Sequence, residues 1–499
     1  MTRRPVFGDL SGAALIAPLL LAACAVGPNY HRPALPASAS YGAEATSPPV
    51  APPVGADSDQ PRLVSGMDIP AQWWGVFHSA DLDALVARAL TDSPTIKAAQ
   101  AALRSAREQV TAQRGFYYPS VSASVQPSHQ NFAKTLSSQT QSGADIYDLT
   151  TTQVSVSYAP DLFGANARAV ESLAAQRDQQ RFELEAARLT LASNVVLAAV
   201  QDALLRAQIE QTRAIILDQQ QTFESYERQH QLGQASNSDL ATQRSLLAQT
   251  QAALPPLEKQ FRINRDLLSA LLGRTPGEPL DVRFDLKSLN LPEPLPLSLP
   301  AQLVEHRPDV RIAEAQLHAA SAQVGVAEAA RWPSLQIEAN AGSAALRLAP
   351  QFNTVSNFWS VAATLTQPIF EGGTLLHRQR AAEAAYDQAA QQYQATVVGA
   401  FQNTADVLHA LWTDADALRA DEAAAEAADA SLDIARRQLG LGDLSRLAVL
   451  SAEQTDAQAR LALLQARANR YADAAALFQA LGGGWWNDAA ARPAAKPAP

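Results

Sequence analysis

The one side chain in this sequence whose type and position suggest covalent chemistry is the thiol of Cys24. Cys24 is the only cysteine among the 499 residues, so no disulfide framework is possible. The sequence has no Gly-x-Ser-x-Gly turn for a nucleophilic serine, no phosphate-binding glycine loop and no His-Glu-x-x-His zinc motif. The eight histidines are scattered and there are only two methionines, so we expect no metal site and no cofactor. These absences predict a protein that is not an enzyme.

The residues before Cys24 are typical of an export signal. Arg3 and Arg4 precede an apolar run from Ala13 to Ala22. That run is too short to span a bilayer, because a membrane helix needs about 20 apolar residues. We therefore expect residues 1–23 to be a signal peptide that is removed.

Cys24 directly follows Leu21-Ala22-Ala23, and this arrangement resembles the lipobox of bacterial lipoproteins. The resemblance implies that the thiol is acylated, for example with palmitate, and that Cys24 becomes the first residue. The alternative is an ordinary apolar cysteine inside a signal peptide. In such lipoproteins a residue other than Asp after the cysteine favours delivery to the outer membrane, and here that residue is Ala25.

The two ends of the exported chain have a composition unlike the middle. Residues 24–65 are rich in Pro, Ala and Ser and lack an apolar period, so we expect a lipid-anchored, extended strap and not a packed element. We expect residues 485–499 to be a disordered tail. No later segment has the continuous apolar run of a transmembrane helix. The net charge is −10, from 39 basic and 49 acidic residues, and no basic cluster indicates nucleic acid as a partner.

The middle of the chain is a duplication. Two landmarks recur 214 residues later and two more recur 209 residues later. The pairs are Pro94 with Pro308, Pro119 with Pro333, Gly233 with Gly442, and Gly273 with Gly482. A repeat of about 200 residues is a duplicated structural half and not a solenoid unit. We therefore expect one structural repeat at residues 66–290 and a second at residues 291–484.

Each half is predicted to contain one long helix and two shorter ones. The long helices, residues 165–232 and 373–439, would each be about 100 Å long at 1.5 Å per residue, so they must pack side by side as a coiled bundle. The shorter helices are expected at residues 93–118 and 237–272, with counterparts at 308–332 and 444–481. The two shorter helices of one half, placed end to end, have about the same length as its long helix. Pro255-Pro256 predicts a kink or break in the second of them.

Between the helices, apolar and polar residues alternate with period two, which predicts strands with one apolar face. The expected strands are residues 119–127, 150–159, 333–344 and 357–367. One interpretation is a small soluble sheet with its apolar face packed on the bundle. The other is a membrane sheet. Four strands cannot close a barrel, and an open edge in lipid leaves backbone groups unpaired, so several chains must then contribute. Three chains would give 12 strands, which is within the usual range.

Three motifs resemble those of the outer-membrane factor (TolC-like) family, in its lipoprotein efflux branch of NodT type. They are Trp73-Trp74-x-x-Phe77 with Leu82-Asp83-x-Leu85, His306 to Ala315, and Thr366 to Gly373. The resemblance covers residues 73–484. It implies a mainly α fold with a membrane β-barrel. In this family a homotrimer forms a 12-stranded barrel in the outer membrane and a 12-helix tunnel in the periplasm.

The resemblance also implies a function and partners. We expect the outer-membrane channel of a tripartite efflux system, a passive conduit for solutes driven by an inner-membrane pump through a periplasmic adaptor protein. Outer-membrane lipid is a further partner and nucleic acid is not. Two alternatives remain: the duct of a protein-secretion system, which shares the architecture, and a structural lipoprotein that braces the envelope without conducting.

The turns after the two long helices are the candidate gate. Gly233 and Gly442 would end those helices in the left-handed conformation. Asp239 matches an aspartate that the family uses in its closing network, and Arg228 or Arg437 is its candidate partner. At the second turn Ala448 and Ser451 replace residues that are often acidic in the family, which makes a cation-binding ring doubtful. There Leu447 would provide an apolar constriction instead.

Overall fold

The structure, a computed structural model, describes residues 26–34, 61–131, 133, 145–291, 294–298, 300–346 and 353–488. The chain divides into two compact units. The first unit contains residues 1–33, 103–180 and 313–393, and the second contains residues 34–102, 181–312 and 394–499. Two long helices, α4 (Ala165–Gln231) and α8 (Thr374–Leu441), run through both units.

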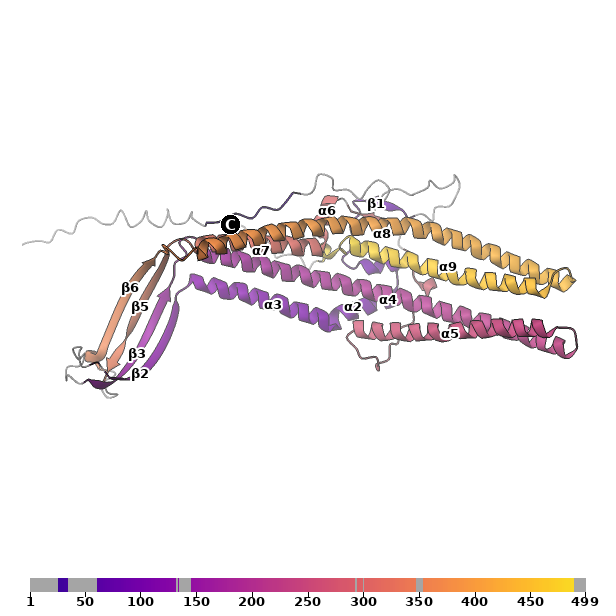
Figure 1. Ribbon diagram of the computed structural model, residues 1–499, viewed down its shortest axis with the longest axis horizontal. Helices are drawn as coiled ribbons and strands as arrows, with labels where there is room; N and C mark the ends of the chain where they lie inside the picture. Colours follow the sequence, from indigo (N-terminus) through magenta and orange to yellow (C-terminus); the bar gives the residue numbers. More distant parts are fainter. Residues whose placement is uncertain are drawn as a thin grey trace, which may run out of the picture. The chain divides into compact units, whose positions relative to one another are not determined.

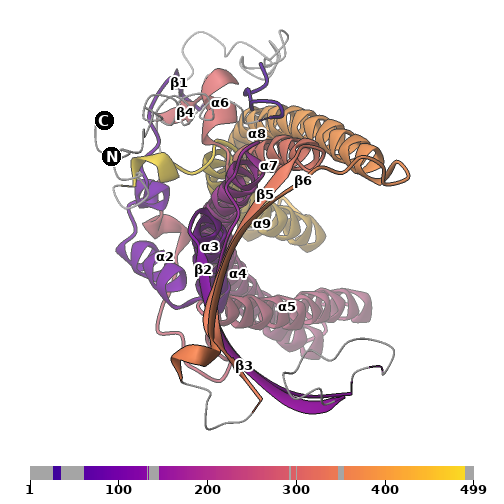
Figure 2. The same cartoon turned by 90° about the vertical axis from the view of Figure 1, so that its left-hand side faces the viewer.

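The first unit holds a four-stranded antiparallel sheet. Its strands are β2 (Ser120–Asn131), β3 (Ile146–Tyr158), β5 (Ser334–Ala345) and β6 (Asn357–Thr366). Their order is β2-β3-β5-β6, so β2 and β6 are the edges (Figure 1). The sheet is curved when viewed along the molecule (Figure 2). The shorter helices α3 (Pro94–Arg114) and α7 (Pro308–Ala329) precede the two hairpins.

The first hairpin is longer than the sequence pattern predicts. Ser128 Oγ donates to the carbonyl of Leu149, and His129 Nδ1 lies 2.7 Å from Asp148 Oδ1 across the strands. These side chains extend the pairing to Asn131 opposite Ile146. The pattern missed the end of β2 because Ser128 to Asn131 are polar on both faces, which removes the period-two signal.

The register places the apolar residues of all four strands on one face. Val121 pairs with Val156, Val156 with Ala339, and Ala339 with Val361. Serine and asparagine pair on the alternate rows, as in Ser155 with Asn340. The sheet as a whole therefore has one apolar and one polar face, as predicted for the single strands. In-register pairing keeps the apolar residues of each strand on the same side.

The second unit is built from two helical hairpins. One joins α4 to α5 (Asn237–Leu271) and the other joins α8 to α9 (Arg446–Ala480) (Figure 1). Ion pairs connect the members of each hairpin, 2.7 Å between Arg213 and Glu258 and 2.6 Å between Arg460 and Asp429. The unit also contains α2 (Ala80–Asp92), α6 (Pro300–His306) and the parallel strands β1 (Leu63–Ser65) and β4 (Leu295–Leu297).

The motif residues around α6 and α9 form a core. Trp73 is 1% exposed and its ring stacks on Phe478 with centroids 5.4 Å apart. Arg307 makes two contacts with Asp309, at 3.1 and 2.8 Å, and donates to the carbonyl of Ala480 at 2.8 Å. This arginine thus ties the start of α7 to the end of α9, where carbonyl groups have no partner within the helix.

Helix α5 is continuous through Pro255-Pro256, so of the kink or break expected there the break is excluded; both prolines are exposed, so water can satisfy the carbonyls that lose their partners. Two other sequence-based expectations are wrong in detail. The segment expected as an unpacked strap contains β1, which pairs with β4. The expected disordered tail begins with a 3-10 helix, Trp485–Asn487, in which Trp485 Nε1 donates to His306 O at 2.7 Å. Both ends were misjudged because their partners are remote in sequence.

The two repeats differ at a polar position that α5 and α9 share. Asn264 of α5 donates to the carbonyl of Ala198 at 2.8 Å. The position 209 residues later is Asp473, where burial, followed by the neighbouring Asp414 carboxyl, raises the pKa from 3.8 to about 7. The folded protein therefore binds a proton at Asp473 more tightly than the unfolded chain does.

We predict that this carboxyl makes the protein less stable as pH rises. A raised carboxyl pKa favours the fold fully below about pH 4, and the advantage is lost as pH increases to about 7. Asp473→Asn, which installs the residue of the first repeat, should flatten that part of the pH profile. The measurement is the urea midpoint between pH 4 and 8. An unchanged profile in the variant would contradict the assignment.

Candidate functional site at the helical tips and the sheet

The two long helices end in the same motif. Gly233 has φ 73° and Gly442 has φ 82°, the left-handed region where a side chain costs energy. The amide of Gly233 donates to His230 O and that of Gln234 to Gln229 O. This bond pattern defines a Schellman motif, and it recurs after α8 around Gly442. The predicted conformation of both glycines is confirmed, and each fixes the reversal into the next helix.

Asp239 has a structural task beside the gating role expected for it. Ser236 caps α5: its hydroxyl accepts from the amide of Asp239 at 3.1 Å, and Asp239 Oδ2 accepts from the Ser236 amide at 3.2 Å. This reciprocal pair is a capping box, which satisfies two otherwise unpaired amides. Ser445 caps α9 in a simpler way, accepting from the amide of Ala448 at 3.3 Å.

The other residues predicted for the gate lie on the same turns. Arg437 forms an ion pair with Asp433, one turn earlier in α8. Arg228 lies in the last turn of α4. Leu447 is in the first turn of α9, but its side chain is outside the described part of the structure. The capping contacts of Asp239 and the ion pair of Arg437 are local, and their gating role stays a prediction.

A link between the two hairpins involves a residue that the sequence did not indicate. Arg436 Nη2 of α8 contacts Asp218 Oδ2 of α4 at 2.8 Å and Glu453 Oε1 of α9 at 3.1 Å. The side chain of Glu453 is only 12% exposed, whereas those of Arg436 and Asp218 are about half exposed. One guanidinium thus joins three helices. No sequence signal connects positions 218 and 436, because their pairing depends on how the hairpins pack.

The electrostatics of this cluster make Arg436 its central member. Burial raises the pKa of Glu453, and the hydrogen bond from Arg436 opposes that rise. Burial alone would lower the pKa of Arg436, but Glu453 and Asp218 together raise it. The cluster has two carboxylates and one cation, so removal of Arg436 would leave two acidic groups facing each other.

An open groove lies between the first turns of α5 and α9. Its volume is about 850 Å³ and its lining side chains are short and mostly polar. They include Ser238, Thr242, Ser445, Ala448 and Ser451. Ala448 and Ser451, the positions where the resemblance led us to look for acidic residues, therefore form part of a neutral surface.

In a single chain, the apolar face of the sheet is not covered by the other parts of the protein that the structure describes. Val121, Val361 and Leu365 are 67%, 67% and 64% exposed, and Trp359 is 78% exposed. A soluble sheet packed on the bundle would have buried these side chains, so that interpretation is wrong. Among the described residues one helix, α4, has an 18-residue stretch apolar enough to cross a membrane, but 67% of this stretch is buried inside the protein. A buried apolar stretch of this kind is what a core helix contains.

Comparisons with known proteins follow the same division of the chain. A family model described as outer membrane efflux protein matches residues 85–274 and, separately, residues 299–483. The chain belongs to this family. Its two matched stretches lie within the two repeats predicted from the sequence, one in each.

Individual relatives cover almost the full length. The chain is 30% identical over 476 residues to the pyoverdine export outer membrane protein OpmQ of Pseudomonas putida, covering 93% of this chain and 99% of the relative. It is 26% identical to nodulation protein T of Rhizobium leguminosarum, over 95% and 93% of the two chains. Among solved structures, the outer-membrane channel OprN superposes with a TM-score of 0.81 at 25% identity, over 93% of this chain and 100% of OprN. The protein is thus an outer-membrane efflux channel with a TolC-like fold.

The capping box supplies a prediction that is independent of gating. Ser236→Ala should destabilise the first turn of α5 by about 1 kcal/mol, since the Asp239 amide loses its acceptor. Hydrogen exchange should increase at the start of α5 and not elsewhere. Ser238→Ala is the control, because Ser238 lies in the same turn and, among the described residues, its side chain makes no hydrogen bond to the cap. Equal exchange in the two variants would contradict a capping role.

Proposed function

We propose that three copies of this chain close a 12-stranded barrel in the outer membrane, which continues as a periplasmic helical tunnel and conducts solutes passively. The observation that carries the proposal is the exposed apolar face on a sheet with two open edges. In lipid such a sheet is unstable alone, since the unpaired N–H and C=O groups of β2 and β6 cost several kcal/mol each. Pairing of β2 in one copy with β6 in the next removes both edges.

The dimensions of the strands support a membrane location. A strand needs about 9–11 residues to cross a bilayer, and the four strands have 10 to 13 residues. The apolar rows would face lipid, and the rows of Ser, Asn and Gln would line a water-filled interior. This division of the faces also explains why strongly polar residues such as Glu338 occur in a membrane strand.

Two neighbouring residues of β6 test which face meets lipid. Val361→Arg should reduce assembly of the barrel, by about 2–4 kcal/mol if the residue lies near the bilayer midplane. Ser360→Arg introduces the same side chain on the opposite face and should assemble normally. The measurement is the fraction of heat-stable oligomer in outer-membrane extracts. The reverse ranking of the two variants would contradict the assignment of faces.

The system that uses the channel follows from the relatives. We propose that a periplasmic adaptor docks at the helical tips and that an inner-membrane pump supplies the energy. Relatives of 28–30% identity have names that mention pyoverdine, antibiotics, toluene and solvents. Because similar channels are named for such different solutes, we infer that the pump, and not the wall of the channel, selects the solute. A secretion duct is the second candidate, and the efflux names of these relatives favour the first.

A closed resting state requires a weak link that an adaptor can reverse. We propose that Arg436, bridging Asp218 and Glu453, contributes this link within each chain, together with the gate predicted for Asp239. The half-exposed pair of Arg436 with Asp218, which joins the two hairpins, contributes only about 0–1 kcal/mol, so three copies give a small bias. An adaptor can overcome such a bias if it binds the open tips more tightly than the closed tips.

The two candidate links can be separated by single-channel recording. Arg436→Gln should raise resting conductance because two carboxylates then repel across the hairpins. Asp239→Gln should do so only if the negative charge matters, since glutamine also forms a capping box. Asp239→Glu keeps both charge and cap and serves as control. Conductance unchanged in both Gln variants, with the oligomer intact, would mean that packing, for example at Leu447, closes the tunnel.

Lipidation is the remaining proposal about the N-terminus, because Cys24 lies outside the described residues. We propose that residues 1–23 are removed and that Cys24 is acylated. A multi-chain lipid together with a barrel gives effectively irreversible anchoring, whereas one acyl chain is marginal. Cys24→Ala should therefore lose radioactive palmitate. If the variant still incorporates the label, the acylation site is elsewhere.

A further inference from the structure

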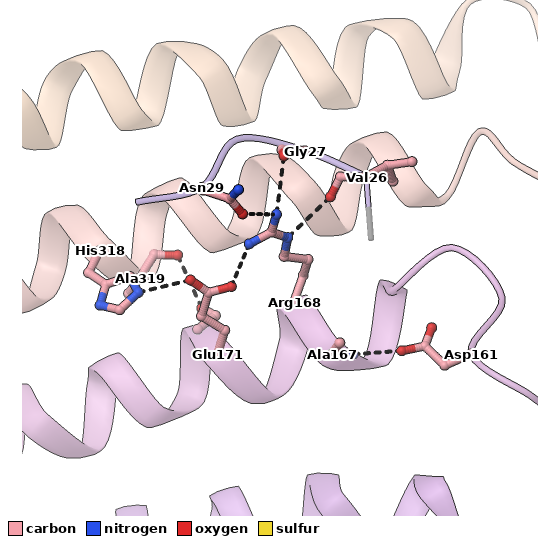
Figure 3. A network of polar contacts seen from close by, with 10 residues as sticks. Val26, Gly27, Asn29, Asp161, Ala167, Arg168, Glu171, His318 and Ala319 are labelled. Atoms are coloured by element: carbon pink, nitrogen blue, oxygen red, sulfur yellow. Dashed lines mark hydrogen bonds and ion pairs between the residues drawn. The ribbon is translucent and has the colours of Figure 1, made fainter. Parts of the chain in front are cut away.

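The segment that follows Cys24 is held against two helices of the first unit. Residues 26–32 lie beside the first turns of α4 and the middle and last turns of α7 (Figure 3). The amide of Val26 donates to Phe163 O, in the turn between β3 and α4, at 3.2 Å. The composition of this Pro- and Ala-rich region suggested an unpacked strap, so its attachment needs a specific cause.

The cause is one buried arginine. Arg168 of α4 is 6% exposed and donates to three acceptors of the segment. They are the carbonyl of Val26 at 3.1 Å, the carbonyl of Gly27 at 3.1 Å and Asn29 Oδ1 at 2.9 Å (Figure 3). The planar guanidinium can bind several acceptors at once because its N–H groups diverge in one plane.

Two further residues hold the guanidinium in this position. Glu171 Oε2 accepts from Arg168 at 2.7 Å, and Glu171 Oε1 lies 2.9 Å from His318 Nε2 of α7. Burial would raise the pKa of Glu171, but the hydrogen bonds of Arg168 and His318 hold it below its ordinary value. The ring of Tyr30 stacks on His318 with centroids 4.3 Å apart, so the segment contacts both helices.

The backbone of the segment also packs closely against α7. Gly27 has φ 95°, and a Cβ added to it would lie 2.4 Å from the Cα of Gly325 in α7. Gly27 therefore cannot carry a side chain here, and a Cβ on Gly325 would lie 2.9 Å from Cγ of Arg168. Farther along, Arg32 pairs with Glu314 of α7 at 3.2 Å. Recognition therefore extends over the whole segment and combines shape, hydrogen bonds and charge.

We propose that this surface of α4 and α7 is a receptor site for the chain's own N-terminal segment, and that docking there fixes the position at which the lipid of Cys24 inserts beside the sheet. Cys24 precedes Val26 by two residues, so its Cα lies within about 7 Å of the Val26 Cα. Val26 is bonded to the turn that ends β3. The lipid would thus be held at a fixed place relative to the strands and would not be a freely moving anchor. This inference rests on the proposed acylation and membrane sheet.

The first test measures docking without reference to transport. Cys24 is the only cysteine, so His31→Cys gives a single free thiol for a nitroxide label once Cys24 is acylated. In the otherwise unchanged chain we expect an immobilised spectrum. Arg168→Gln and, independently, Gly27→Ala should make it mobile. Arg177→Gln is the control, since Arg177 lies on the same helix but pairs with its neighbour Asp178. A spectrum unaffected by either variant would overturn the receptor site.

The second test asks whether the docked length matters. Four residues, Gly-Ser-Gly-Ser, inserted between Ala25 and Val26 lengthen the tether by up to about 14 Å and should slow formation of the heat-stable oligomer. The same insertion between Pro33 and Ala34 leaves the docked segment intact and should not. Equal rates for the two insertions would overturn the positioning role. Failure of the proposed barrel is distinguishable, because no heat-stable oligomer would then form even without an insertion.

Discussion

The backbone hydrogen bonds of the sheet are the constraint on which this structure depends. Within one chain, β3 and β5 pair on both sides, while β2 and β6 pair on one side only. Water could satisfy the free edges of a soluble sheet, but the apolar face of this sheet is exposed and is suited to lipid. In lipid no solvent replaces the missing partners, so other strands must supply them. The proposed assembly from further copies of the chain follows from this constraint and not from the helices.

The duplication supplies each set of elements twice in one chain. Each half supplies one hairpin of strands and one long hairpin of helices, with α4 and α8 of 67 and 68 residues. Matching glycine motifs reverse the chain at both tips. Buried polar differences between the halves, such as Asn264 against Asp473, and the Arg436 cluster show that the repeats are no longer equivalent. Duplicated architecture therefore coexists with different chemistry at the two hairpins.

Most of the architecture could be predicted from the sequence, because it depends on local sequence patterns. Period-two strands, proline-free helices of strong helix formers and glycines after the long helices are each visible within a short window. What the sequence could not provide depends on partners remote in the chain. Arg436 with Asp218, Arg168 with the residues after Cys24, and Trp485 with His306 are all separated by more than 130 residues. Asp239 was selected for a gate, yet its local role as a helix cap was overlooked.

The measurement that tests this account most directly is native mass spectrometry of the protein extracted from outer membranes in lipid nanodiscs. If strand edges dictate assembly, the inserted form has the mass of three mature chains, and no inserted monomer is present. A membrane-inserted monomer or dimer that remains folded in lipid would contradict the account, because its open edges would then be tolerated without partners.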